Sequence, residues 1–124
     1  MNIVDSSGWI EYFEDGSNAD YFSFPIRDVE NLLIPVICVY EVFKRMCLKR
    51  GEEDALKAAG FMALGMEIEL NREVAISAAH LSLELKLAMA DSIILATAQA
   101  YDATLWTQDE HFEAIPGVKY IAKK

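Results

Sequence analysis

Short apolar runs alternate along the chain with longer segments whose apolar residues recur every three or four positions. The short runs are typical of buried strands, and the longer segments are typical of helices with one apolar face. The expected strands are Asn2–Val4, Leu32–Pro35, Met66–Leu70, Thr104–Thr107 and Val118–Ala122. The expected helices are Ser7–Asp15, Asn18–Arg27, Ile37–Lys49, Glu53–Leu64, Arg72–Lys86, Asp91–Tyr101 and Asp109–Ala114.

This alternation predicts crossover connections between parallel strands, with helices on both faces of one sheet. We therefore expect an α/β fold, in the form of a three-layer α/β/α sandwich around a mostly parallel sheet of four to five strands. The helix at Asp91–Tyr101 is almost entirely apolar, which predicts that it is buried. The chain has 124 residues without a linker or repeat, so we expect a single domain spanning residues 1–124.

Composition excludes several classes of protein. Apolar residues make up 53% of the chain, which excludes a disordered acidic segment. No apolar run reaches the roughly 18–20 residues that cross a bilayer, and the first residues lack the basic region of a signal peptide. Cys38 and Cys47 have no spacing typical of a zinc site. We expect a cytoplasmic protein with reduced thiols and no membrane partner.

The formal net charge of −9 argues against a nucleic-acid partner, unless the acids surround bound cations that reverse the local field. Four acids are candidates for such a site because of their positions. Asp5 and Asp109 come just after expected strands. Glu41 and Asp91 lie in expected helices.

Each acid alone has an ordinary structural explanation. Asp5 could form a turn or cap the helix that follows it. Asp91 could stabilise the start of its helix, either by capping it or through the helix dipole. Glu41 could pair with Arg45, one helical turn away.

Asp109 could be a first-turn acid, because Thr107 and Glu110 have the spacing of a capping box. These explanations do not account for the convergence of four acids at the carboxyl edge of one sheet, where open α/β folds bind ligands. Carboxylates brought together raise one another's pKa values unless a cation compensates them. A pair of Mg²⁺ ions in such a site can hold a phosphodiester and activate water.

The segments that carry the acids resemble the PIN-domain family, and within it the VapC-type toxins of prokaryotic toxin–antitoxin pairs. They are IVDSSGWIEYF with Asp5, LLIPVICVYEVFKR with Glu41, and LAMADSIILATAQAYDATLWTQDEHF with Asp91 and Asp109. The resemblance covers essentially the whole chain. The ordered set of Asp, Glu, A-D-x-x-x-x-A-T-A and T-x-D-x-x-F makes it fairly specific.

The resemblance implies a PIN-like nuclease domain that hydrolyses RNA phosphodiester bonds. It implies an endoribonuclease that depends on Mg²⁺, with Mn²⁺ able to substitute, and that is the toxin of a toxin–antitoxin pair. It also implies a homodimer blocked by a small VapB-like antitoxin with a DNA-binding domain. The metal ligands and catalytic residues would be Asp5, Glu41, Asp91 and Asp109, with Ser6 and Thr107 supporting the site.

Other residues carry weaker expectations. Cys38 departs from the family, which often has Ser or Thr before the glutamate, so the start of that helix could be held less well. Lys44, Arg45 and Lys86 could bind RNA phosphates or could be ordinary surface charges. The aromatic residues near the first acid could stack on RNA bases, pack in the core or form a groove for the antitoxin; they are Trp9, Tyr12 and Phe13.

A histidine general base is not expected, because water activated by a metal makes one unnecessary. His80 lies far from the motifs, and whether His111 or Glu110 assists the site is left open. Two alternative functions are weighed. The first is a PIN-fold RNA-binding or assembly module without significant turnover. The second, a phosphorylated receiver domain, is disfavoured because Glu41 and not an aspartate follows the second strand.

Overall fold

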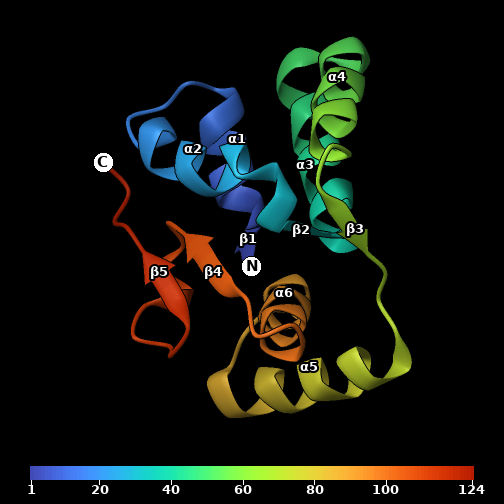
Figure 1. Cartoon of the computed structure of the whole chain (residues 1–124), viewed down its shortest axis with the longest axis vertical. Coiled ribbons are helices and arrows are strands. Elements are labelled where there is room, and N and C mark those ends of the chain that lie inside the picture. The colour runs from blue at the N-terminus through green and yellow to red at the C-terminus, as the bar shows by residue number, and fades with distance from the viewer.

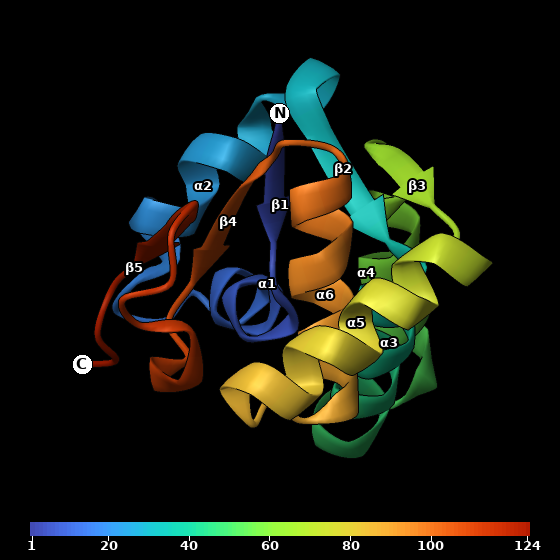
Figure 2. The same cartoon turned by 90° about the horizontal axis from the view of Figure 1, so that it is seen from below.

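A single sheet of five parallel strands forms the centre of the computed structural model, which describes residues 1–124. The sheet has the order β3-β2-β1-β4-β5, with β1 at its centre (Figure 2). The strands are β1 (Asn2–Val4), β2 (Leu32–Pro35), β3 (Met66–Ile68), β4 (Thr104–Thr107) and β5 (Val118–Tyr120). Every strand pair is parallel, which confirms the predicted mostly parallel sheet.

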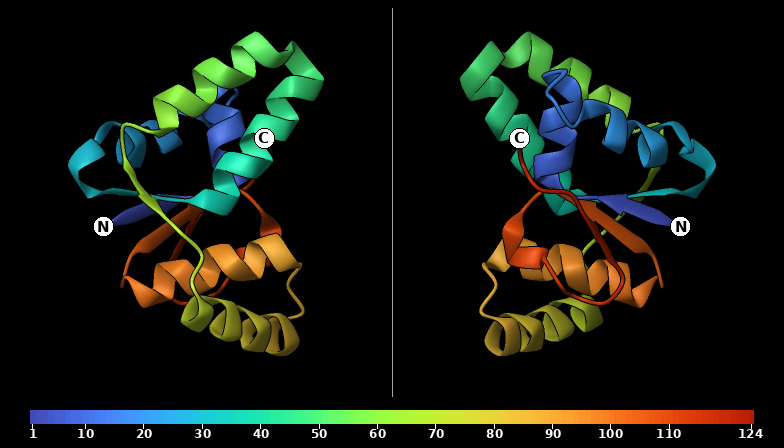
Figure 3. Two further views of the ribbon diagram at one scale, coloured as in Figure 1. Left: turned by 90° about the vertical axis from the view of Figure 1, so that its right-hand side faces the viewer. Right: turned by 90° about the vertical axis from the view of Figure 1, so that its left-hand side faces the viewer.

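Helices cover both faces of the sheet, so the predicted three-layer α/β/α arrangement is confirmed (Figures 1 and 3). One face carries α1 (Ser6–Phe13), α2 (Ala19–Arg27), α3 (Val36–Arg50) and α4 (Glu52–Met62). The other face carries α5 (Arg72–Leu85) and α6 (Met89–Ala100). The remaining helices are two short 3-10 helices, η1 (Val29–Asn31) and η2 (Glu110–Phe112). None of these helices is long and apolar enough to cross a lipid bilayer.

Burial in the core explains why the sequences of the central strands are mostly apolar. Ile3 and Val4 of β1, Leu33 of β2 and Leu105 of β4 are fully buried because helices lie on both faces. In α6 every residue from Ser92 to Ala98 is buried, as its sequence predicts. The centre of the sheet is therefore a rigid support for residues that follow the strand ends.

The start of α1 packs so closely on β1 that only glycine fits there. A Cβ atom on Gly8 would lie 2.6 Å from Val4 Cγ1 and 2.7 Å from the Phe22 ring. Both neighbours are fully buried and have no room to move. Gly8 thus allows the first turn of α1 to lie directly on the end of the central strand.

Gly8→Ala is expected to lower the free energy of unfolding by about 1–3 kcal/mol, because the added methyl group overpacks this contact. Chemical denaturation of the metal-free protein would measure the change. Gly60→Ala is the matched control, because a Cβ on this α4 residue meets nothing within 4 Å. The control should be neutral or slightly stabilising, since alanine favours helix. Equal stability of the Gly8 variant and the control would contradict the close packing of α1 on β1.

Some predicted boundaries were wrong. The helix expected at Asp109–Ala114 is only the single turn of η2, and the strands expected at Met66–Leu70 and Val118–Ala122 end two residues earlier. The helix expected from Asp91 begins at Met89. This last shift places Asp91 inside the helix and not at its start.

Candidate active site

The carboxyl ends of β1 and β4 lie side by side and bring two of the candidate acids together. Val4 pairs with Trp106 in the parallel ladder, and Asp5 N donates to Trp106 O at 3.1 Å. Asp5 and Thr107 therefore leave the sheet at the same edge, and Asp109 follows two residues later. This is the edge at which ligands bind in open α/β sheets.

Asp5 is both a helix cap and a buried acid. Its Oδ1 accepts hydrogen bonds from Gly8 N at 2.9 Å and from Ser7 Oγ at 2.8 Å, which caps α1 as the sequence suggested. Its Oδ2 accepts a hydrogen bond from Thr107 Oγ1 at 2.6 Å. Burial raises the pKa of Asp5 to about 6, although these three hydrogen bonds act in the opposite direction. Capping therefore explains only part of its environment.

Thr107 links the first and last acids of the site. Its hydroxyl donates to Asp5 and accepts from Asp109 N at 2.9 Å. The capping box expected for Thr107 and Glu110 is wrong, because Asp109 itself caps η2 by accepting from His111 N at 2.9 Å. Glu110 is exposed and does not line the pocket that the acids share.

Glu41 reaches the same edge from α3. Its Oε1 accepts a hydrogen bond from Ser6 Oγ at 2.6 Å, so the serine after Asp5 orients the glutamate. The ion pair suggested for Glu41 and Arg45 is absent. Cys38 lies inside α3, fully buried, with its thiol 3.9 Å from Val4 O. The helix begins two residues earlier, at Val36, so Cys38 is not its cap.

Asp91 is the third residue of α6 and does not cap it. The N-cap position is Ala88, and no side chain there makes a capping hydrogen bond, so the capping explanation for Asp91 is wrong. The half-buried carboxyl has a pKa raised to about 6, mainly by burial and then by the charges of Asp109 and Glu41. A protonated His111 acts in the opposite direction on the same pKa. Asp91 therefore faces the other acids.

One pocket of about 600 Å³ gathers all four predicted acids, Asp5, Glu41, Asp91 and Asp109, in its lining. They come from the end of β1, from α3, from α6 and from the loop after β4. No lysine or arginine forms an ion pair with any of them. The predicted acids thus converge, and none of them is neutralised by an ion pair with a lysine or arginine.

Basic residues also line this pocket. Lys44 and Arg45 are there as predicted, whereas Lys86 lies outside the lining at the end of α5. Two further lysines that the sequence pattern did not single out, Lys123 and Lys124, follow β5 and line the same pocket. Lys49 was also not predicted; it lines the pocket and pairs with Glu14 at 2.9 Å.

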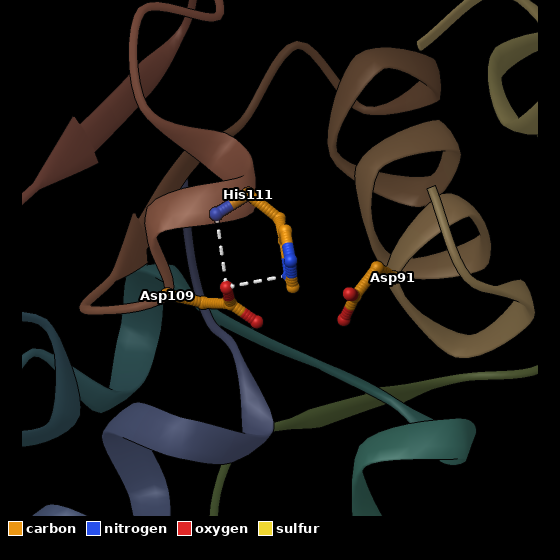
Figure 4. A group of neighbouring side chains, drawn as sticks. All are labelled: Asp91, Asp109 and His111. Carbon is orange, nitrogen blue, oxygen red and sulfur yellow. Dashed lines mark hydrogen bonds and ion pairs between the residues drawn. The ribbon is translucent and has the colours of Figure 1, made fainter. Parts of the chain in front are cut away.

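Asp91 and Asp109 of the pocket lining and the neighbouring His111 lie close enough to bind one ion together. One ligand atom each from Asp91, Asp109 and His111 lies within 4.8 Å of the others, and the His111 ring points into the space between the two acids (Figure 4). Asp5 and Glu41 line the same pocket as the two aspartates but are not part of this group. Carboxylate oxygens predominate among the donors, and such a set fits a hard divalent cation.

Comparison with protein families matches the model of the PIN domain over residues 3–118. No curated protein sequence matches the chain significantly. Among solved structures, the chain is similar to a protein of a toxin–antitoxin complex from Klebsiella pneumoniae. The two chains are 26% identical with a TM-score of 0.79, and the match covers 96% of each.

Two further structures share the fold at lower identity. VapC20 from Mycobacterium tuberculosis, described as a sarcin-ricin loop cleaving toxin, is 13% identical with a TM-score of 0.79, covering 94% of this chain and 95% of that one. VapBC2 from Rickettsia felis, bound to a DNA fragment from its promoter, is 16% identical with a TM-score of 0.75, covering 99% and 98%. The family match covers most of the chain and includes all four acids, and so the chain belongs to the PIN domain family.

Proposed function

We propose that this protein is a metal-dependent endoribonuclease and acts as the toxin of a toxin–antitoxin pair. The observation that carries the proposal is the convergence of four acids from separate segments into one pocket at the carboxyl edge of the sheet. They are Asp5, Glu41, Asp91 and Asp109, and no lysine or arginine pairs with them. A bound cation would compensate this charge and would explain why the acids are gathered there.

The proposed ion is Mg²⁺, for which Mn²⁺ can substitute, held by the four acids. When bound, it supplies a water activated for attack on phosphorus and charge to stabilise the leaving oxygen. The protein's own contribution is orientation. Ser6 holds the carboxylate of Glu41, and Thr107 holds that of Asp5 while also fixing the backbone of Asp109. Such support restricts the carboxylates to few orientations.

RNA is the proposed substrate because a relative with the same fold is described as cleaving the sarcin-ricin loop. Lys44, Arg45, Lys123 and Lys124 would bind phosphates around the acidic centre. Related structures include toxin–antitoxin complexes, which supports a small VapB-like antitoxin with a DNA-binding domain as the partner. We further propose a cytoplasmic homodimer in which residues 1–124 form one nuclease domain.

A time course with structured RNA tests the proposal. The purified protein should cut the RNA internally with Mg²⁺ or Mn²⁺, and cleavage should stop when EDTA is added. The alternative, an RNA-binding or assembly module without turnover, predicts that the metal changes RNA binding while the RNA stays intact. Intact RNA at enzyme excess would therefore favour the alternative.

The two lysines after β5 give a separate prediction about RNA binding. Their position depends on Asn18, whose Nδ2 donates to Ala122 O at 3.1 Å and to Gln108 Oε1 at 2.9 Å. Ile121 N also donates to Thr107 O at 3.0 Å. These bonds hold the segment that carries the two lysines beside the loop that follows β4.

Replacing both Lys123 and Lys124 with alanine should weaken RNA binding several-fold. The slope of log Kd against log salt should also fall by about 0.7 for each phosphate that the protein no longer neutralises. Fluorescence anisotropy in an Asp91→Asn background without added metal, in which the RNA is expected to stay intact, would measure both quantities. Lys57→Ala is the control, because this exposed α4 lysine lies outside the pocket lining. An unchanged salt slope in the double variant would exclude these lysines from phosphate binding.

A further inference from the structure

His111 occupies a position beside the pocket that the four-acid description does not explain. Its Nδ1 lies 3.0 Å from Asp109 Oδ1, and its backbone N donates to the same oxygen at 2.9 Å. The imidazole extends from this contact toward Asp91 (Figure 4). A ring nitrogen of His111 and one carboxylate oxygen from each of the two acids lie within 4.8 Å of one another.

The backbone on both sides of His111 is held in place. Asp109 caps the single turn of η2, and its own backbone N is bonded to Thr107 at 2.9 Å. The next residue, Phe112, is fully buried and anchors the turn in the core. The imidazole itself is 70% exposed, so it can turn toward a ligand without breaking any packing. The turn therefore presents the histidine beside Asp109 in a defined place.

We propose that His111 is a nitrogen ligand of the metal centre, together with Asp91 and Asp109, and that it makes the centre prefer Mn²⁺ over Mg²⁺. The inference rests on the metal binding in the proposed function and adds a ligand that the four-acid set does not contain. Neutral imidazole is a good ligand for transition-metal ions, whereas Mg²⁺ takes oxygen ligands and retains several waters.

The spacing fits coordination to one ion. In an octahedral site with metal–ligand distances of about 2.1 Å, adjacent ligand atoms lie about 3.0 Å apart. The observed distance from Nδ1 to Asp109 Oδ1 is 3.0 Å, and an Asp91 oxygen belongs to the same group of ligand atoms, which all lie within 4.8 Å of one another. Coordination through Nδ1 requires its lone pair, so the ring proton then resides on Nε2.

The alternative is that His111 only pairs with Asp109 or contacts the RNA. Nitrogen coordination differs from both because it leaves a magnetic signature on a bound Mn²⁺ ion. Electron spin-echo modulation of the RNA-free protein loaded with Mn²⁺ should show ¹⁴N coupling. The coupling should change to the ¹⁵N pattern when histidine is isotopically labelled. This measurement needs no variant and no catalytic turnover.

Metal titrations give the matching thermodynamic result. His111→Gln should raise the Kd for Mn²⁺ by about tenfold or more and the Kd for Mg²⁺ by less than about threefold, because only Mn²⁺ loses a favoured ligand. His80→Gln is the matched control, because the other histidine of the chain is exposed on α5 and outside the pocket. The control should retain both affinities and the ¹⁴N coupling.

The possible results separate this inference from the proposed function. Mn²⁺ bound at the wild-type site without nitrogen coupling, and with equal affinity in His111→Gln, would overturn the ligand role and leave the acidic centre standing. If the wild-type protein bound neither Mn²⁺ nor Mg²⁺, both the inference and the proposed metal dependence would be wrong. Lower cleavage by His111→Gln with unchanged metal affinities would assign His111 to the RNA and overturn the ligand role.

Discussion

Asp91→Asn is expected to lower the single-turnover rate of RNA cleavage by about 10²- to 10³-fold at saturating Mg²⁺. This corresponds to a loss of a few kcal/mol of transition-state stabilisation, which is typical when a metal site loses an anionic ligand. The fold should persist, because Asp91 makes no capping hydrogen bond in α6 and asparagine has nearly the same shape. The same variant should no longer arrest growth when it is expressed in cells.

Asp102→Asn is the matched control for this substitution. Asp102 is exposed in the turn between α6 and β4, and its φ of 51° is one that asparagine adopts readily. This variant changes the net charge by the same amount as Asp91→Asn. It should retain cleavage and toxicity because Asp102 lies outside the pocket lining. Full toxicity of the folded Asp91 variant would show that the acidic pocket is not the active site.

The second large effect is on stability, and it concerns Asp5. Its pKa is about 6 in the folded protein against 3.8 as the ordinary value, so the folded state holds the proton more tightly. The metal-free protein should therefore lose stability as the pH rises from about 4 to above 6. For Asp5 the loss amounts to about 3 kcal/mol. Asp91 acts in the same direction, with a smaller effect because it is only half-buried.

Urea denaturation in EDTA at pH 5 and at pH 7.5 would measure this dependence. Asp5→Asn removes the titrating group, so the stability difference between the two pH values should shrink relative to wild type. Saturating Mg²⁺ should stabilise the wild-type protein more at pH 7.5 than at pH 5, because binding requires ionised carboxylates. A wild-type protein whose pH dependence matched that of Asp5→Asn would contradict the assigned burial of this charge.

The sequence was sufficient to locate the acids because each sits at a recognisable point of a simple pattern. Asp5 and Asp109 follow short apolar strands, and parallel strands end at one edge of a sheet. The bounds of β1, β2 and β4 agree with the prediction. Most residues of these strands are buried, which restricts them largely to apolar side chains.

The start of α6 was harder to predict for a physical reason. Sequence patterns mark a helix start by a capping side chain, and α6 has Ala88 at that position with no side-chain cap. Asp91 therefore looked like the cap when it is the third helical residue. Its orientation toward Asp109 depends on how α6 packs against the sheet, which local sequence does not encode.

The roles of the lysines after β5 and of His111 depend on contacts between distant segments. Lys123 and Lys124 reach the pocket because Asn18 binds Ala122, 104 positions away in the chain. The relation of His111 to Asp91 likewise requires the packing of α6 against the loop after β4.

The hydroxyl of Thr107 combines a local hydrogen bond with one to a distant segment. The spacing of Thr107 and Glu110 pointed to a capping box, which needs only neighbouring residues. In the folded chain Asp109 caps η2, and the hydroxyl accepts from Asp109 N while donating to Asp5, a buried acid 102 positions away in the sequence. A buried carboxyl group needs donors within the protein because water does not reach it, and only the fold brings the Thr107 hydroxyl to Asp5.

The most direct test of the central claim is the chemistry of the RNA ends left by cleavage at varied Mg²⁺ concentration. Water attack on phosphorus leaves a linear phosphate monoester and a free hydroxyl, whereas attack by the RNA's own 2′-hydroxyl leaves a cyclic phosphate. The proposed mechanism predicts linear monoester ends, a cleavage rate that saturates with Mg²⁺, and no cleavage in EDTA. Cyclic phosphate ends formed at an undiminished rate in EDTA would contradict it.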